Sequence, residues 1–184
     1  VRPVNYEFWD KVGQGVGNLK ALGVLMISLH NGLGEPDWEI LARILPHIQS
    51  KIELRIISGR IDRIEEMRTF ASAIQGNSAI TRFDTRIAGF SFESAATLCS
   101  ALTTLPNLES VLLTQRLLGR DEGVPTFQLT KSMTEFLRTP SLRIVKLKHF
   151  CLTSSLCQAI AMALRQGSSI TSLVLDQCSF PEGG

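Results

Sequence analysis

The residue types that most often carry chemistry occur in this chain, but they do not form a reactive motif. His30, His47 and His149 are far apart, and although His149 lies close to Cys151, no second pair completes a metal site. Ser, His and Asp residues are present, but no pattern places a nucleophile beside a base. Cys157 falls within an expected helix, which favours packing over catalysis. We therefore expect neither enzyme activity nor a bound metal or cofactor.

A glycine-rich segment near the N-terminus invites comparison with a phosphate-binding loop. Residues 12–17 read Val-Gly-Gln-Gly-Val-Gly, but no strand precedes them and no Gly-Lys-Ser or Gly-Lys-Thr follows. The alternative is a helix over residues 6–16, although three glycines weaken a helical pattern. We favour the helix and expect residues 1–21 to be the end of a preceding unit or an N-terminal cap.

Composition and charge exclude several classes of function. The chain has 184 residues, of which 44% are hydrophobic and 20% charged, as in one ordinary globular domain. Its net charge of +2 is too small to indicate nucleic-acid binding. No apolar run reaches the roughly 18 residues of a transmembrane helix, so no membrane partner is expected.

The cysteines indicate the compartment. Three of the four fall on expected apolar faces or at a repeat position, so we expect free thiols rather than disulfides. The four are Cys99, Cys151, Cys157 and Cys178. Free thiols favour an intracellular, reducing compartment, in this case the cytoplasm.

One apolar pattern recurs along the chain and predicts the elements that position any site. Leu142-x-x-Val145-x-Leu147 reads as a short strand, and Ile170-x-x-Leu173-x-Leu175 repeats it. Units start near residues 22, 52, 80, 108, 142 and 170, with spacings of 30, 28, 28, 34 and 28. In the second unit the register is open, because either Arg55 and Ile57 or Leu54 and Ile56 can be the inward pair.

Helical patterns lie between these strands. They cover residues 37–49, where Pro46 can end the helix early, then 63–75, 126–138, and the segments after Ser91 and Thr153. Strands that run in one direction and return through helices form a parallel sheet. Neither a strand nor a helix buries its apolar face alone, so the units must stack and share a core. The fold class is therefore α/β.

The last units resemble a known repeat family. Ile170-x-x-Leu173-x-Leu175-x-x-Cys178-x-Phe180, preceded by the helix ending Ala161-Met-Ala-Leu164, resembles the ribonuclease-inhibitor type of leucine-rich repeat. The resemblance extends over residues 22–180 and weakens in earlier units, where Arg55 and Thr85 stand at leucine positions. It implies a curved horseshoe solenoid over residues 1–184, with the parallel sheet on the concave side and the helices on the convex side. We expect the chain to be a piece of a longer array, truncated at its C-terminus.

The resemblance also implies a class of function. Members of this family are mostly scaffolds that bind proteins on the concave sheet; some are modules of larger innate-immunity sensors, and one branch activates a small GTPase. We expect a protein-binding scaffold, with a GTPase regulator, a sensor module of a larger signalling protein and a purely structural spacer as alternatives.

Outward strand positions define the expected concave surface. Its three rows are Val24, Leu54, Arg82, Ser110, Ile144 and Ser172; Met26, Ile56, Asp84, Leu112, Lys146 and Val174; and Ser28, Ser58, Arg86, Thr114, Lys148 and Asp176. The candidate partner-binding residues are Arg82, Asp84, Arg86, Leu112, Thr114, Lys146, Lys148, Val174 and Asp176. They predict a mixed patch for a protein partner with an acidic spot, or else a solvated face with weak ion pairs.

Two further features remain as hypotheses. The longest unit holds a charged, glycine-containing insertion at residues 117–123, either a tolerated surface loop or a contact to a partner. If the chain regulates a GTPase, Arg116 or Arg120 is the candidate arginine finger. The strand over residues 170–175, with Leu173 and Leu175 expected in the core, would end the sheet and self-associate through its unpaired edge.

Overall fold

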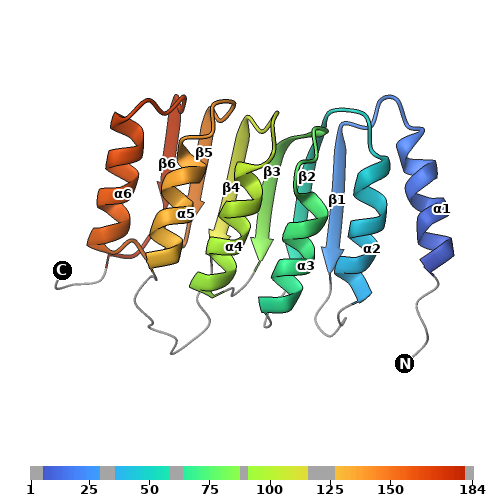
Figure 1. The fold of residues 1–184 in the computed structure, drawn as a ribbon, viewed down its shortest axis with the longest axis horizontal. Helices are drawn as coiled ribbons and strands as arrows, with labels where there is room; N and C mark the ends of the chain where they lie inside the picture. The colour runs from blue at the N-terminus through green and yellow to red at the C-terminus, as the bar shows by residue number, and fades with distance from the viewer. Residues whose placement is uncertain (1–5, 30–35, 59–63, 88–90, 116–126, 181–184) are drawn as a thin grey trace.

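Strands and helices alternate along the whole chain in the computed structural model, which describes residues 6–29, 36–58, 64–87, 91–115 and 127–180 (Figure 1). The strands are β1 (Val24–Leu29), β2 (Ile52–Ser58), β3 (Ile80–Ile87), β4 (Ser110–Gln115), β5 (Ile144–Lys148) and β6 (Ser172–Asp176). The helices are α1 (Tyr6–Gly17), α2 (Pro36–Ile44), α3 (Ile64–Ile74), α4 (Phe92–Thr103), α5 (Phe127–Leu137) and α6 (Ser154–Arg165), with a 3-10 turn, η1 (Leu45–His47), after α2.

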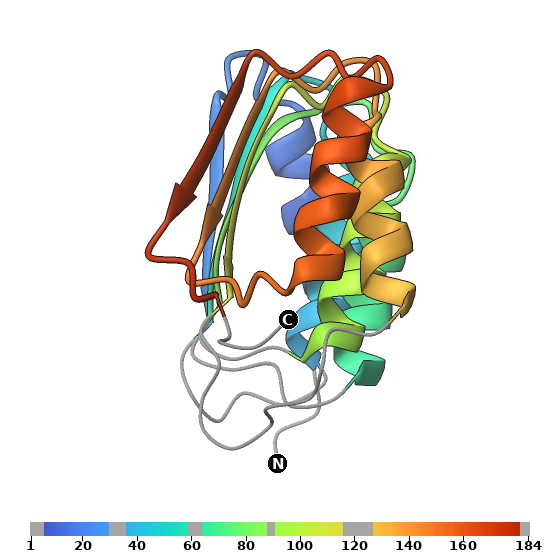
Figure 2. The same ribbon diagram turned by 90° about the vertical axis from the view of Figure 1, so that its left-hand side faces the viewer.

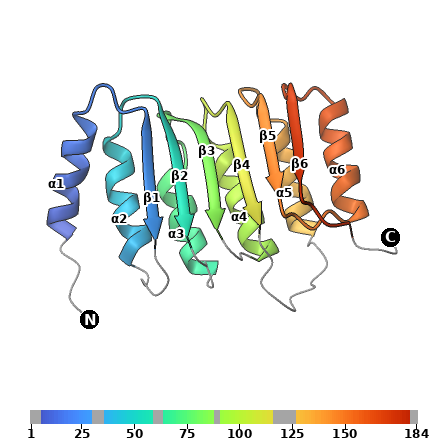
Figure 3. The same cartoon turned by 180° about the vertical axis from the view of Figure 1, so that it is seen from behind.

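All described strands belong to one open sheet in the order β1-β2-β3-β4-β5-β6, and every neighbouring pair is parallel (Figure 3). The helices form one layer on the same side of this sheet, and the other side is uncovered by the described chain (Figure 2). The predicted α/β class and the parallel sheet are therefore confirmed. Within the described residues, no helix has both the length and the apolar character needed to cross a bilayer.

The core lies between the sheet and the helix layer. Alternate strand residues point into it, and they align in two rows across the sheet because neighbouring strands are in register. In the middle strands these residues are at most 1% exposed. The two rows are Leu54, Phe83, Val111 and Val145, and Ile56, Thr85, Leu113 and Leu147.

The second strand settles the register that the sequence left open. Leu54 and Ile56 point inward, so they do not belong to the uncovered face where the alternation first placed them. The first two apolar residues of β2 are one position closer together than in the other units, and a register shift after Ile52 absorbs the difference. Burying Leu54 and Ile56 also keeps the charged side chain of Arg55 out of the core.

Thr85 is a polar residue at a core position. Its side chain is fully buried, and its hydroxyl donates a hydrogen bond to the backbone oxygen of Leu112, 3.4 Å away on β4. A buried hydroxyl without a partner would cost free energy, so this bond explains how the core accommodates it.

Helix ends follow local sequence signals. Ser91 and Thr153 cap α4 and α6 by accepting hydrogen bonds from the backbone nitrogens of Ser94 and Leu156. Pro46 ends the second predicted helix early, because the chain tightens into η1 at Leu45–His47. Gly76 follows α3 with a positive φ of 69°, a conformation that favours glycine.

The glycine-rich N-terminal segment is helical, which overturns its comparison with a phosphate-binding loop. It lies in α1, which packs against α2 and η1. A Cβ at Gly17 would lie 2.3 Å from the backbone oxygen of His47, and one at Gly13 would lie 2.7 Å from the His47 ring. The glycines therefore allow a close helix approach that larger residues would prevent.

Side-chain hydrogen bonds join three pairs of neighbouring units near the starts of β2, β3 and β6. The hydroxyls of Ser50, Thr81 and Thr171 donate to the backbone oxygens of Leu22, Ile52 and Arg143, each at 3.2 Å. In each bond the donor lies 28 or 29 residues after the acceptor, which is about one unit along the chain. They fix the stacking of one unit on the next.

The last strand corrects an expectation. Leu175 is 44% exposed and Leu173 is half-buried, although both lie in the inward rows. Inner strands have helices on both flanks, whereas no helix follows β6 within the described residues. The side chains of β6 are therefore covered from one flank only.

Because β5 is covered by helices on both flanks and β6 on one, a leucine-to-alanine substitution should lower the free energy of unfolding by different amounts in the two strands. Leu147→Ala should lower the free energy of unfolding by about 2–5 kcal/mol, because the fully buried side chain leaves a cavity. Leu175→Ala, at the register partner of Leu147 on β6, should cost less than half as much. Urea denaturation of both variants measures the two costs, and equal costs would contradict the one-sided cover of β6.

The four cysteines are free thiols, but only Cys99 is fully buried. The expectation that Cys157 and Cys178 pack away from solvent is too strong, because both are half-buried. Burial raises the pKa of the Cys99 thiol to about 12. Alkylation needs both a thiolate and access.

We therefore expect Cys99 to be the slowest cysteine to alkylate in the native protein, behind Cys151, Cys157 and Cys178. Mass spectrometry of the labelled peptides resolves the four rates, and unfolded protein in urea gives the reference in which the rates converge. Native Cys99 that reacts as fast as Cys151 would contradict its burial.

Candidate protein-binding face

The side of the sheet opposite the helices is called here the open face. Strand alternation and register place three rows of side chains on it. The rows are Val24, Glu53, Arg82, Ser110, Ile144 and Ser172; Met26, Arg55, Asp84, Leu112, Lys146 and Val174; and Ser28, Ile57, Arg86, Thr114, Lys148 and Asp176.

The structure brings the predicted sheet residues together on the open face. These are Arg82, Asp84, Arg86, Leu112, Thr114, Lys146, Lys148, Val174 and Asp176. The second strand contributes other residues than expected: Glu53, Arg55 and Ile57 take the places given to Leu54, Ile56 and Ser58. Ser58 instead lies in register with Leu29 and Ile87. Arg116, Arg120 and the insertion at 117–123 lie outside the described residues.

Alternation inside β2 was the signal that would have found Glu53 and Arg55. Ile52, Leu54 and Ile56 are apolar at every second position, which is the pattern of a strand buried on one side. The spacing of the other units favoured a different register and hid this pattern. A salt bridge on the open face was therefore missed.

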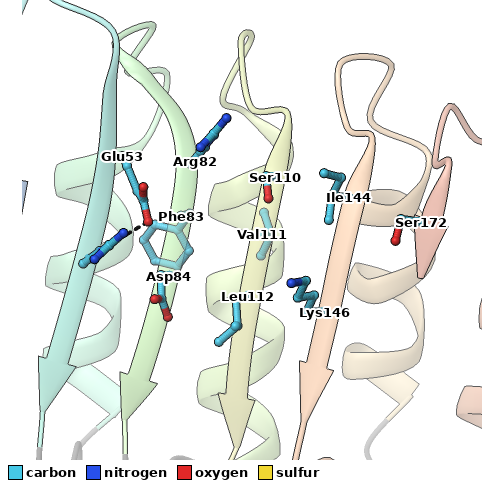
Figure 4. Close-up of a pocket in the computed structure, with 11 residues that line it drawn as sticks. Glu53, Arg82, Phe83, Asp84, Ser110, Val111, Leu112, Ile144, Lys146 and Ser172 are labelled. Carbon is cyan, nitrogen blue, oxygen red and sulfur yellow. Dashed lines mark hydrogen bonds and ion pairs between the residues drawn. The ribbon is translucent and has the colours of Figure 1, made fainter. Parts of the chain in front are cut away.

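A shallow groove of about 490 Å³ crosses the centre of the open face (Figure 4). Charged side chains of β2 and β3 line one end, and Ser110, Leu112, Ile144, Lys146 and Ser172 line the other. Exposed apolar residues flank it: Val24 and Met26 on β1, and Val174 on β6. Exposed apolar side chains that lie beside polar and charged ones can mark an interaction surface.

Ion pairs compensate part of the charge on this face. The Arg55 guanidinium donates a hydrogen bond from Nε to Oε1 of Glu53 at 2.6 Å, and this bond holds the pKa of the Glu53 carboxyl below its ordinary value. On the last strands, Nζ of Lys148 lies 3.0 Å from Oδ2 of Asp176. Both pairs are partly exposed, so each contributes little to stability.

Asp84 is the least solvated charge on the open face. Its side chain is 14% exposed, and its buried Oδ1 atom has no hydrogen-bond partner among the described residues. Its Oδ2 atom lies 3.7 Å from Nη2 of Arg86, which is too long for a strong hydrogen bond. Burial raises the pKa of Asp84 above its ordinary value, and the positive charges of Arg86 and Arg55 oppose that rise.

Two cations on this face are in ion-pair contact with no carboxylate among the described residues, although Arg82 neighbours Glu53 on β2 and its charge helps to lower the pKa of that carboxyl. Arg82 and Lys146 form no ion pair there, whereas Arg55, Arg86 and Lys148 each have one. Both line the groove (Figure 4). The groove therefore offers hydrogen-bond donors that the described chain leaves unused.

The described residues hold no cluster of metal-binding side chains. In the described part of the chain, no group of three or more His, Cys, Asp or Glu side chains is arranged to hold a metal ion. Comparison of the chain with protein-family models and with curated proteins finds no match. The geometry of the open face is therefore the basis for a functional proposal.

The burial of Asp84 predicts how stability depends on pH. Because the folded-state pKa of Asp84 is raised above 3.8, the native state binds more protons than the unfolded state between these two values. Ionised Asp84 thus lowers stability as pH rises through its folded-state pKa. Asp84→Asn removes the charge. The free energy of unfolding of the variant minus that of the parent chain should therefore increase as pH rises from about 3.8, and should then remain constant above the folded-state pKa of Asp84.

Urea denaturation across a pH series measures the difference between the two proteins. Asp176→Asn is the control, because its ion pair is exposed and contributes little. A variant at Asp84 that loses stability relative to the parent as pH rises would contradict the prediction. It would mean that attraction to Arg86 and Arg55 outweighs the cost of burying the charge.

Proposed function

We propose that this chain is a protein-binding module whose open face receives a segment of a partner protein. The observation that carries the proposal is the groove, in which Arg82 and Lys146 form no ion pair with a carboxylate of the described residues while exposed apolar residues lie on both sides. Exposed apolar side chains can supply contact area in an interface, and complementary charges set its specificity. The helix layer occupies the other side of the sheet, and the described chain leaves the open face uncovered (Figure 2).

The proposal includes a finer class: a leucine-rich-repeat solenoid of the ribonuclease-inhibitor type that works in the cytoplasm. The repeated hydrogen bonds between units support it. So does a turn that recurs after the last two strands, where His149 and Gln177 both have positive φ, 57° and 51°. The free thiols favour a reducing compartment.

Peptide selection tests whether the open face is the binding surface. A library of random linear peptides is selected on the immobilised chain, and the enriched peptides are then measured on two variants. Ser110→Trp fills the groove with a large side chain, whereas Ser72→Trp places the same side chain on the exposed side of α3. We expect binding to be lost with Ser110→Trp and kept with Ser72→Trp.

The remaining outcomes contradict the proposal. Peptides that bind Ser110→Trp as well as the parent chain use another surface. A selection that enriches no peptide favours a purely structural spacer. Circular dichroism of both variants establishes that the loss with Ser110→Trp does not come from unfolding.

A further inference from the structure

The two halves of the groove differ in what they leave unsatisfied. On β2 and β3, Glu53 and Asp84 face Arg55 and Arg86, so each carboxylate has a positive neighbour. Around β4 the side chains without an ion pair or a hydrogen bond in the described chain are donors. They are the Arg82 guanidinium, the Lys146 ammonium and the hydroxyls of Ser110 and Ser172.

Register places the two unpaired cations on either side of β4. Arg82 is the neighbour of Ser110 on one side, and Lys146 is the neighbour of Leu112 on the other. Two strand spacings and two residues separate them, so their Cα atoms are about 12 Å apart. In Figure 4, Arg82 extends from β3 toward β4, and Lys146 lies between β4 and β5. Both side chains are long enough to approach an acceptor group above Ser110.

The remaining charges on the open face limit the class of ligand. Carboxylates of Glu53, Asp84 and Asp176 lie among its cations, so the positive surface is interrupted. A nucleic-acid backbone or an anionic membrane needs an unbroken positive surface, and either would meet these carboxylates at close range. A short protein segment places single negative charges at chosen points and avoids them.

We propose that the groove recognises an acidic segment of a partner protein, whose Asp or Glu carboxylates bind between Arg82 and Lys146. The inference rests on the proposed function and names the chemistry of its partner. The apolar parts of the groove, Leu112 and Ile144, would contact the rest of the segment.

The probe for this site is a fluorescein-labelled peptide of alternating Glu and Ser, compared with a peptide in which Gln replaces Glu. Fluorescence anisotropy on the 184-residue chain should show binding of the Glu peptide only, weakened by added salt. The double variant Arg82→Gln with Lys146→Gln should bind it about fivefold more weakly or worse, since each exposed pair contributes up to about 1 kcal/mol.

Two further variants separate this site from net charge. Lys131→Gln with Arg165→Gln removes the same charge from exposed positions on α5 and α6, and it should leave binding unchanged. Arg82→Lys with Lys146→Arg keeps the charges and should keep binding. Thermal unfolding of each variant confirms the fold.

Equal weakening by the two Gln double variants would overturn the proposal, because binding would then follow overall charge. So would equal binding of the Glu and Gln peptides. If Ser110→Trp abolishes binding of the selected peptides but the Glu peptide does not bind, the proposal of an acidic ligand is wrong and the open face is still the binding surface. If Ser110→Trp also has no effect on selected peptides, the proposed function itself fails.

Discussion

The fold depends on how completely helices cover the inward side chains of each strand. The inward residues of β2, β3, β4 and β5 are almost fully buried beneath the helix layer. Leu25 and Ile27 on β1, and Leu173 on β6, are only partly buried. Because a strand and its helix share their core with both neighbours, stability is a property of the stack and is greatest at its centre.

Placing every helix on one side has a consequence for the other. The open face needs no packing, so it can carry charges that a core could not accept. Asp84 is the exception, because it lies between the side chains of Arg55 and Leu112 on the neighbouring strands. Its buried Oδ1 atom accepts no hydrogen bond from the described residues. Arg82 and Lys146 line the groove and keep their donors available for a partner.

Sequence patterns predicted most of the fold and part of the face, and their errors have physical causes. Apolar spacing located every strand within two residues, because a one-sided core imposes alternation. It left the register of β2 open, because Ile52 and Leu54 are two residues apart, whereas the first two apolar residues of the other units are three residues apart. It overstated the burial of Leu175, because cover depends on a neighbouring helix rather than on the residue itself. Whether Arg82 and Lys146 form ion pairs depends on which carboxylates lie close to them on neighbouring strands. Apolar spacing along the chain does not predict these distances.

Native-state hydrogen exchange of the backbone amides, followed by NMR, tests the central claim that cover from both flanks holds the sheet. The account predicts the slowest exchange in the hydrogen-bonded amides of β2, β3, β4 and β5, with protection falling toward the edge strands β1 and β6. Protection that is as high in β6 as in β4 would contradict it, because the half-covered end of the stack would then be as stable as its centre.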